Sequence, residues 1–379
     1  MTACHPAINF SVSELLARLN AEVSAGNVSV KTHPIYPHLM LYCYTKQCVY
    51  ERAWNDVNVL ARGLIIDAQT GNIIAFTYPK FYNVGEMDKP IPDLAFDAYE
   101  KLDGSLIAVW HYNGEWHAST KGSFESDQAR WASTEMHAKG WYKYMLPGTT
   151  YLFEAIYPEN KIVIPYGYSG LVLHGAYNSS GMEYNHGQLA GFQSHLGCRM
   201  AKLYSFSSVS EMLIAAKSLP FTEEGWVLRF EDGYRLKVKG DEYKRIHAAV
   251  SNLTPLNVWQ AMLDDEAHTM RRDLPEEFWA DFDSIRSLLG QTMEKVSEQI
   301  FKGVLKCSDY TDKQVGLILH ELPEIVRKTI FTTRKQGFAA LWEKGSKSRK
   351  GIFQTFRPTG NKLPGYTPSW AVRQVMEEI

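Results

Sequence analysis

Two hydrophobic patterns divide this chain of 379 residues. From about residue 40 to residue 239, short runs of Ile, Val, Tyr and Phe alternate with Gly, Asn and Asp, which is typical of strands joined by tight turns. After Gly240, turn residues become rare and apolar positions recur every three or four residues, which indicates helices. We therefore expect an α+β protein, with a domain of antiparallel sheets over residues 1–248 and an all-helical domain over residues 249–379.

A helix is also predicted ahead of the sheets. Ser11 followed by Glu14 fits a capping box. Apolar residues then recur at helical spacing, at Leu15, Leu16, Leu19 and Val23. The chain is thus expected to begin with a short helix.

The first predicted hairpin turns at the Asn-Gly pair 113–114, the strongest short-range hairpin signal. If Tyr112 faces Glu115, the returning strand brings Lys121 opposite Leu106. The stretch TKGS, residues 120–123, is then expected beside the stretch YEKLDGSLI that precedes the hairpin.

A second hairpin is predicted at the Asp-Gly pair 232–233. If Glu231 faces Tyr234, side-chain alternation groups charged residues on one face and apolar residues on the other. The charged face would carry Glu224, Lys237 and Lys239, and the apolar face Val227, Leu236 and Val238. The alternative is that the charged face is simply solvated, as is common in antiparallel sheets.

A third hairpin is predicted to turn near residues 69–71, with Arg62 and Lys80 at its open end. Basic side chains thus gather at the end or face of each of these hairpins. Arg offers planar bidentate contacts and Lys a point charge, so a mixed set suits phosphates in different positions. The three hairpins together suggest a pocket for a polyphosphate.

Composition places the chain among ordinary globular proteins and excludes several classes. It has 45% apolar and 22% charged residues, and no run of about 18 apolar residues that would suggest a membrane helix. Five cysteines without a C-x-x-C pair argue against a disulfide framework and a zinc site. Zincin, P-loop and dinucleotide-binding motifs are absent from the sequence. We expect a cytoplasmic protein, in the host cytoplasm if it is phage-encoded.

Charge is distributed unevenly along the chain. The net charge of -2 conceals a segment, residues 325–375, that carries eleven Lys or Arg against the single acid Glu343. Aromatic residues are interleaved with these cations, at Phe331, Phe338, Trp342, Phe353 and Phe356. Such a block suits a nucleic acid whose bases can stack. The alternative, a solvated helical face with a buried aromatic stripe, is equally open at this point.

Lys101, Asp103 and Gly104 stand just before a predicted strand, in YEKLDGSLI. A K-x-D-G motif arises by chance in roughly one chain of this length in ten, and a lysine at a strand entrance is usually a solvated charge. Glu154 lies in an apolar strand, where a buried carboxylate needs a partner such as a cation or a ribose hydroxyl. A surface position for Glu154 is the equally simple alternative.

Taken in chain order, these motifs resemble the ordered set of the covalent nucleotidyltransferases, the superfamily of ATP-dependent ligases and capping enzymes. The set consists of Lys101-x-Asp103-Gly104, Lys121-Gly122-Ser123, Phe153-Glu154, Glu224-Gly225 and Lys237-x-Lys239. The flanking residues are most similar to the bacteriophage-type RNA ligase 1 family, over about residues 40–245. They include Ala61-Arg62-Gly63, Lys80-Phe81-Tyr82-Asn83 and Asn160-Lys161-Ile162-Val163.

The resemblance implies a nucleotidyltransferase domain in which Lys101 attacks the α-phosphorus of ATP and retains AMP. The AMP then passes to an RNA 5′-phosphate, and a 3′-hydroxyl displaces it. Because a free lysine amine, with a pKa of about 10.4, is charged at neutral pH, we expect crowding by cations and burial to favour its neutral form. The implied ATP-binding residues are Tyr42, Arg62, Lys80, Lys101, Lys121, Glu154, Glu224, Lys237 and Lys239.

The resemblance also implies individual roles. Glu154 would hold the ribose, and Lys237 and Lys239 would grip the phosphates. Glu224, alone or together with Asp103, would orient a hydrated Mg²⁺ or Mn²⁺. Further candidates are Gly104 and Tyr243 at the site, and Asp264 and Asp265 as metal contacts from the helical domain.

The expected partner is RNA with 5′-phosphate and 3′-hydroxyl ends, such as a cleaved tRNA. Since no P-loop kinase motif occurs, a separate end-healing kinase or phosphatase is expected to supply those ends. Two alternatives stay open, a DNA ligase or capping-type enzyme and a non-catalytic RNA-binding protein. The former usually continue into an all-β OB domain, whereas helical spacing begins here directly after Gly240.

Overall fold

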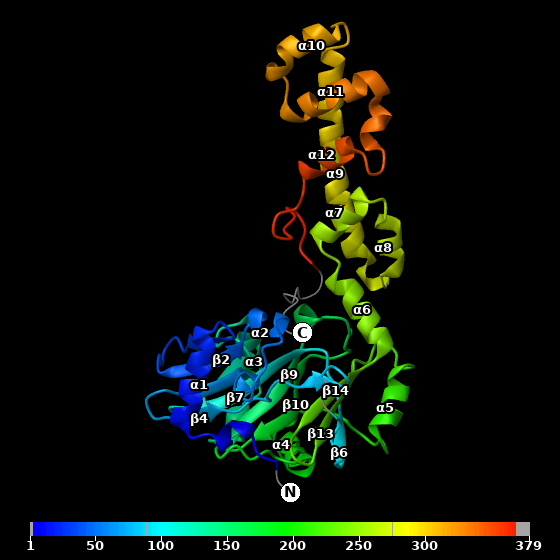
Figure 1. Ribbon diagram of the computed structural model, residues 1–379. Coiled ribbons are helices and arrows are strands. Elements are labelled where there is room, and N and C mark those ends of the chain that lie inside the picture. Colours follow the sequence, from blue (N-terminus) through cyan, green and yellow to red (C-terminus); the bar gives the residue numbers. More distant parts are fainter. Residues whose placement is uncertain (1–2, 88–89, 275, 369–379) are drawn as a thin grey trace. The chain divides into compact units, whose positions relative to one another are not determined.

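The computed structural model describes residues 3–87, 90–274 and 276–368 (Figure 1). These residues form two compact units, one up to residue 245 and one from residue 246. The first is built on sheets and the second on helices, which confirms the expected α+β class. Arg373, the last cation of the basic segment, lies outside the described residues.

Three sheets make up the first unit. The four-stranded sheet contains β1 (Val28–Thr32), β2 (Leu39–Tyr44), β3 (Arg62–Asp67) and β4 (Ile73–Ala75) in that order. One five-stranded sheet has the order β11 (Arg199–Met200), β10 (Gly170–Tyr177), β9 (Thr150–Ile156), β7 (Ser105–Tyr112), β8 (Glu115–Thr120). The other has the order β12 (Leu203–Tyr204), β6 (Phe96–Glu100), β13 (Gly225–Phe230), β14 (Arg235–Lys239), β5 (Tyr82–Asn83). The described pairings are antiparallel except β10 with β11 and β14 with β5.

The helices of the first unit are short. They are α1 (Val12–Ser24), α2 (Lys46–Tyr50), α3 (Asp127–Ala138), α4 (His186–Leu196) and α5 (Val209–Ala216). Helix α6 (Asp241–Ser251) follows β14 and runs past residue 245. The predicted N-terminal helix is confirmed as α1, because the Ser11 hydroxyl accepts a hydrogen bond from the Glu14 backbone.

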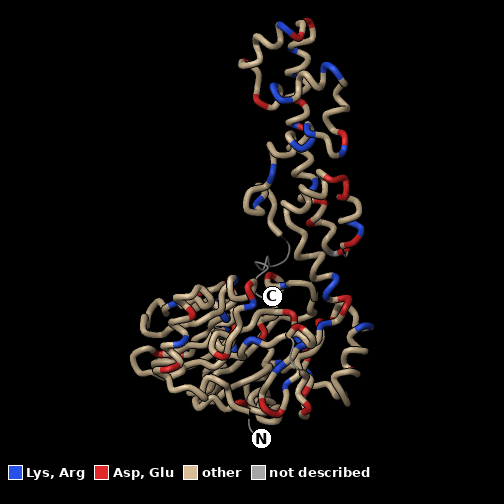
Figure 2. The backbone as a smooth tube through the Cα atoms, viewed as in Figure 1, with Lys and Arg blue, Asp and Glu red and all other residues tan. Residues whose placement is uncertain are grey.

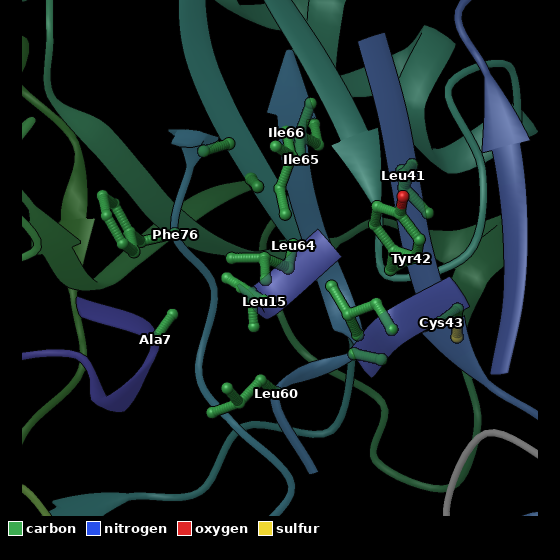
Figure 3. Close-up of a cluster of buried hydrophobic side chains, with 14 of the residues drawn as sticks. Ala7, Leu15, Leu41, Tyr42, Cys43, Leu60, Leu64, Ile65, Ile66 and Phe76 are labelled. Carbon is green, nitrogen blue, oxygen red and sulfur yellow. The ribbon is translucent and has the colours of Figure 1, made fainter. Parts of the chain in front are cut away.

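Helix α1 and the four-stranded sheet share one hydrophobic core. Leu15 and Leu19 of α1 are fully buried against Leu41, Leu64 and other apolar residues of the strands. Figure 3 shows part of this cluster, with Leu15 beside Leu64. The core covers one face of this sheet. Arg62 lies in the same sheet, at the start of β3.

The hairpin between β7 and β8 has the predicted register. Tyr112 pairs with Glu115, and Ile107 pairs with Thr120 at the far end. Asn113 and Gly114 both have positive φ, at 50° and 81°, as a primed two-residue turn requires. Lys121 therefore leaves β8 close to where β7 begins.

The hairpin between β13 and β14 differs from the prediction by one residue. Arg229 pairs with Arg235, and Val227 pairs with Lys237. The reason is a three-residue loop in place of the expected two-residue turn: the Phe230 backbone donates to Tyr234, and Gly233 takes a φ of +87°.

The shifted register changes which residues share a face. Val227 lies with Lys237 and not with the apolar set, so its predicted position was wrong. The buried face consists of Trp226, Leu228, Phe230, Leu236 and Val238. The other face presents Val227, Arg229, Arg235 and Lys237 to the pocket described below.

The second unit is mainly helical in its described part, where residues after Gln354 are irregular. Its helices are α7 (Pro255–Leu263), α8 (Ala267–Asp273), α9 (Trp279–Lys306), α10 (Asp312–Ile318), α11 (Glu324–Gln336) and α12 (Lys347–Gln354). A core around Ile300, Val326 and Ile352 joins α9, α11 and α12. None of the helices in the described ranges combines the length and apolar character that crossing a membrane would need.

Candidate active site

A pocket opens among the strands of the first unit. The empty space between its walls, open mouth included, is about 1300 Å³. Seven residues expected at the site line it: Arg62, Lys80, Lys101, Gly104, Lys121, Glu154 and Lys237. These residues come from hairpins far apart in the sequence, so the fold brings most of the predicted cations together.

Lys101 directly follows β6, and its amine lies against a carboxylate. Its Nζ is 2.5 Å from Oε1 of Glu224, and Nζ of Lys239 is 3.1 Å from the same oxygen. The Glu224 side chain is fully buried, whereas Lys101 keeps 15% of its side chain exposed. The amine thus contacts an acid, which the sequence did not predict, and one of the expected cations, Lys239, contacts the same oxygen.

Gly225 allows Glu224 to approach Lys101. Its φ is +136°, and a Cβ at this position would lie 2.0 Å from the Val238 carbonyl oxygen. The Gly225 carbonyl accepts a hydrogen bond from the Lys101 backbone. Only glycine fits here, which explains why the motif pairs a glutamate with a glycine.

Glu154 is directed into the pocket from β9. Its Oε1 accepts a hydrogen bond of 3.1 Å from the backbone of Gly104. A Cβ on Gly104 would lie 2.6 Å from the Ala155 carbonyl oxygen, so a side chain would push the two strands apart. Glu154 is thus held by the same K-x-D-G segment that contains the lysine, and not on the surface.

Aromatic rings flank the cations of the pocket. The Lys80 ammonium lies 5.5 Å from the ring centroid of Trp54 and 5.1 Å from that of Tyr82. Lys121 lies 5.3 Å from the ring of Tyr44. Burial lowers the pKa of Lys80, and nearby Arg62 acts in the same direction. Contacts with ring faces leave such cations able to bind an anionic ligand.

Arg62 and Lys237 supply further positive charge. The Arg62 guanidinium lies 5.4 Å from the centroid of Phe81, which also lines the pocket. Lys237 is buried on the pocket face of β14. Together with Lys80 and Lys121 they form a positive lining suited to a chain of phosphates.

Asp103 is a structural anchor and not an open metal ligand. Its Oδ2 accepts hydrogen bonds from the backbones of Val163 and Ile164, at 2.8 and 2.9 Å. Its Oδ1 accepts one of 2.8 Å from the hydroxyl of Tyr243, which is fully buried. Both oxygens are occupied by the protein, so the prediction of Asp103 as a metal ligand does not fit the structure.

Tyr42 does not reach the pocket. It is 1% exposed within the core around α1 (Figure 3), and its hydroxyl faces Asn20. Tyr44 lines the pocket instead. A β-bulge between Tyr42 and Cys43 disturbs the alternation at this point, and the sequence carries no clear signal for it.

Asp264 and Asp265 lie in the second unit and have partners there. Asp264 is the C-cap residue of α7 and accepts a hydrogen bond from the Gln260 side chain. Asp265 forms an ion pair of 2.5 Å with Arg349. Both residues therefore serve at the end of α7 within the second unit, where the sequence had suggested metal contacts.

Glu224, whose side chain is fully buried, is a candidate contact for a metal ion. No group of three or more His, Cys, Asp or Glu capable of holding a metal ion occurs within residues 3–87, 90–274 and 276–368. Mg²⁺ is often held by one or two carboxylates together with phosphate oxygens and water. Glu224 is a buried carboxylate beside the positive lining and could serve in that way.

Several pocket residues were not predicted. They include Tyr44, Tyr78, His174, Glu183, Arg229 and Arg235. Glu183 joins two arginines, with Arg229 at 2.8 Å and Arg235 in a shorter contact. Arg235 shares its strand face with Lys237, so alternation could have identified it. His174 carried no comparable signal, because it lies at a bulge in β10.

The basic segment divides into surface and structural cations. Lys335, Lys347, Lys350 and Lys362 are exposed, and Figure 2 shows Lys and Arg recurring along this part of the chain. Arg334 and Arg349 instead donate to backbone carbonyls within the unit. The aromatic residues pack into or against the helical core, so the interpretation of an exposed stacking stripe is not supported.

Comparisons of the sequence with known proteins give two kinds of match, to a protein family and to individual proteins. Residues 60–243 match a protein family described as RNA ligase. The chain is 28% identical over 288 residues, 67% of its length, to a protein of Autographa californica nuclear polyhedrosis virus named "Putative bifunctional polynucleotide kinase/RNA ligase". It is 27% identical over 121 residues, 30% of its length, to a "Putative RNA ligase" of Thermovibrio ammonificans. The aligned parts span only 40% and 32% of these relatives.

Among solved structures, an archaeal ATP-dependent RNA ligase is similar with a TM-score of 0.48 and 15% identity, over 74% of this chain and 79% of the other. By these sequence matches, the chain is similar to RNA ligases. More particularly, the similarity to the RNA ligase family extends over residues 60–243. The resemblance to the phage-type RNA ligase 1 family is thereby confirmed.

Proposed function

We propose that this protein is an ATP-dependent RNA ligase that joins 5′-phosphate and 3′-hydroxyl RNA ends through a lysyl-AMP intermediate. The observation that carries the proposal is the amine of Lys101, placed between the buried carboxylate of Glu224 and a lining of cations. A nucleophile needs a base within hydrogen-bond distance, and Glu224 at 2.5 Å meets that condition. No other residue need move for the proton to leave the amine.

In the first step, the Lys101 amine would form a bond to the α-phosphorus of ATP while the bond to pyrophosphate breaks. The positive lining formed by Arg62, Lys80, Lys121 and Lys237 would neutralise the triphosphate and the charge that develops on it. A Mg²⁺ or Mn²⁺ bound with the phosphates would add further positive charge, with Glu224 as its carboxylate contact. Glu154, held against Gly104, would bind the ribose.

In the later steps, AMP would pass from Lys101 to the RNA 5′-phosphate, and the 3′-hydroxyl would displace it. We propose residues 1–248 as the adenylyltransferase part and residues 249–379 as the part that recognises RNA, through its exposed cations. The viral relative is named for both a kinase and a ligase. A separate kinase or phosphatase that prepares the RNA ends would fit this combination of kinase and ligase in one relative. Repair of cleaved tRNA is the pathway that we propose.

The decisive experiment is transfer of label from α-³²P-ATP in the presence of Mg²⁺, followed by mapping of the labelled peptide. The label is expected on Lys101 and is expected to be absent from a Lys101→Arg variant that melts at the wild-type temperature. Label elsewhere, or RNA binding without any label, would show that the protein is not a ligase of this kind. Sealing assays on a broken tRNA, a single-stranded RNA and a nicked DNA duplex would then separate RNA ligase from DNA ligase.

A further inference from the structure

Arg52 has a backbone conformation that arginine rarely adopts. Its φ is 51°, in the left-handed region. Among the described residues, the other non-glycine residues with a positive φ are Asn113, Asp265 and Asn361. Asn and Asp tolerate this conformation because their short polar side chains can hydrogen-bond locally. Arginine has no such compensation, so its presence at this position needs an explanation.

The strained residue lies at the end of helix α2. The Arg52 backbone donates a hydrogen bond to the Val49 carbonyl, and the Ala53 backbone donates one to the Cys48 carbonyl. These two bonds form a helix-closing motif that usually has glycine at its left-handed position. Glycine would close the helix in the same way without the steric cost of a Cβ. The turn itself therefore gives no reason for an arginine at residue 52.

The Arg52 side chain is exposed. Within the part of the chain that the structure describes, its guanidinium makes no hydrogen bond, ion pair or ring contact. Tyr50, two residues earlier, is 66% exposed. Glu51 between them is also exposed, and its carboxylate accepts a hydrogen bond of 3.5 Å from the Gln47 side chain. A planar cation and an exposed aromatic ring thus lie two residues apart on the surface.

This exposed segment is close to the pocket. Trp54 follows Arg52 by two residues, and its ring centroid is 5.1 Å from that of Tyr44 and 5.5 Å from Nζ of Lys80. Tyr44 and Lys80 both line the pocket. Buried residues of α2 belong to the same small hydrophobic cluster as Tyr44 and Trp54. One side of the segment is therefore packed against pocket-lining residues, and the other side is in solvent.

We infer that Arg52 and Tyr50 contact the RNA strand that carries the 5′-phosphate, with the guanidinium on a backbone phosphate and the ring stacked on a base. The inference rests on the proposed function, which requires the RNA 5′-phosphate to reach Lys101. The nucleotides behind that phosphate must then pass over surface next to the pocket. Arginine binds phosphate oxygens through two parallel hydrogen bonds, and aromatic rings stack on bases of any sequence.

The backbone strain separates this role from a structural one. Arg52→Gly should relieve the strain and lower the unfolding equilibrium constant by roughly two- to fivefold, because the left-handed conformation costs arginine more than the extra freedom of glycine costs on folding. The same substitution should weaken RNA binding. A side chain that only supported the fold could not show gain of stability together with loss of binding.

The experiment measures urea denaturation and the binding of a 5′-phosphorylated single-stranded RNA with a blocked 3′ end. In Arg52→Gly and Arg52→Gln, loss of one phosphate contact should lower the affinity about fivefold at about 0.1 M salt and reduce the salt slope by about 0.7. Tyr50→Ala should lower the affinity by at least about fivefold without changing the slope, whereas Tyr50→Phe should retain it. Label transfer from ATP, which involves no RNA, shows whether the pocket is intact.

The matched control is Lys217→Gln, which removes an exposed cation at the end of α5 and should leave the RNA affinity unchanged. An equal loss of affinity in this control would overturn the inference, as would wild-type affinity in both Arg52 variants. Lower stability of Arg52→Gly would also overturn it, because the argument from strain would fail. Arg52→Gln keeps a Cβ at this position and decides the binding result in either case.

The proposed function and this inference fail in different ways. Normal label transfer with unchanged RNA affinity in the Arg52 and Tyr50 variants would remove the inference and leave the ligase standing. Selective loss of RNA affinity in a protein that never takes label on Lys101 would refute the ligase and leave the RNA contact standing. Absence of RNA binding by the wild-type protein would defeat the inference outright.

Discussion

Nζ of Lys101 and Oε1 of Glu224 are 2.5 Å apart, and the backbones on which they lie are joined as well, since Lys101 donates to the carbonyl of Gly225. Lys101 directly follows β6 and Glu224 directly precedes β13, and these two strands pair antiparallel in one sheet. Lys239 approaches the same carboxylate from β14. One buried acid thus orders two of the predicted lysines, and one of them, Lys101, lines the pocket.

Replacing Glu224 by Gln is expected to reduce both stability and adenylylation. Removing one partner of a buried ion pair typically costs 3–5 kcal/mol, and about 3 kcal/mol is expected here because both lysines are partly exposed. Loss of a positioned base should slow label transfer by at least about 100-fold. Urea denaturation and initial rates measure the two effects. Glu223→Gln, at the exposed neighbouring position, should leave both unchanged.

Gly225→Ala is expected to lower the free energy of unfolding by more than about 3 kcal/mol, because the new Cβ would collide with the Val238 carbonyl and the residue has a positive φ. Label transfer should be lost with it, as Glu224 could no longer lie against Lys101. The matched control is Gly191→Ala in α4, where a Cβ meets nothing within 4 Å. Its stability should rise slightly or stay unchanged, and an equal loss in both variants would contradict the argument.

Tyr243→Phe is expected to lower stability by about 1.5–3 kcal/mol, because Asp103 loses a hydrogen bond donated to its charged carboxylate. Combined with Asp103→Asn, the loss should be smaller than the sum of the two single losses. The metal concentration that gives half-maximal labelling should not change in Tyr243→Phe, since Asp103 is assigned a structural role. A marked shift in that concentration would restore Asp103 as a metal ligand. Tyr50→Phe, at an exposed tyrosine, serves as the control for hydroxyl removal.

The exposed cations of the helical unit are expected to bind RNA. Deleting the segment from residue 325 would test this poorly, because Val326 and Ile330 of α11 are core residues. Alanine at Lys335, Lys347, Lys350 and Lys362 should weaken RNA binding and reduce its salt dependence by about one unit of slope for each phosphate that is no longer neutralised by a lysine. Label transfer from ATP should be unaffected.

The control for the RNA-binding variant removes the same charge from the first unit, with alanine at the exposed Lys31, Lys46, Lys143 and Lys217. Filter binding of a single-stranded RNA at several salt concentrations compares the two sets. Equal weakening by both would mean that RNA is attracted by overall charge alone, and the specific role of the helical unit would have to be abandoned.

Rules about neighbouring residues were sufficient to predict those features whose conformation depends on nearby sequence. The Asn-Gly turn at 113–114 determined its own register, because two-residue turns admit few backbone conformations. The change from strand to helix near Gly240 was visible in the spacing of apolar residues alone. Motif order was sufficient to identify the family.

Tertiary structure decided those features that depend on contacts between residues distant in the sequence. The loop after Phe230 takes three residues, with Gly233 close to Ala3, and this moved Val227 to the pocket face. A bulge turned Tyr42 into the core, and the backbones of Val163 and Ile164 occupied Asp103. Residue types and their order indicate which chemistry a chain can carry. Which carboxylate meets the lysine, and which anchors a loop, depends on packing and hydrogen bonding between segments that meet only once the chain has folded.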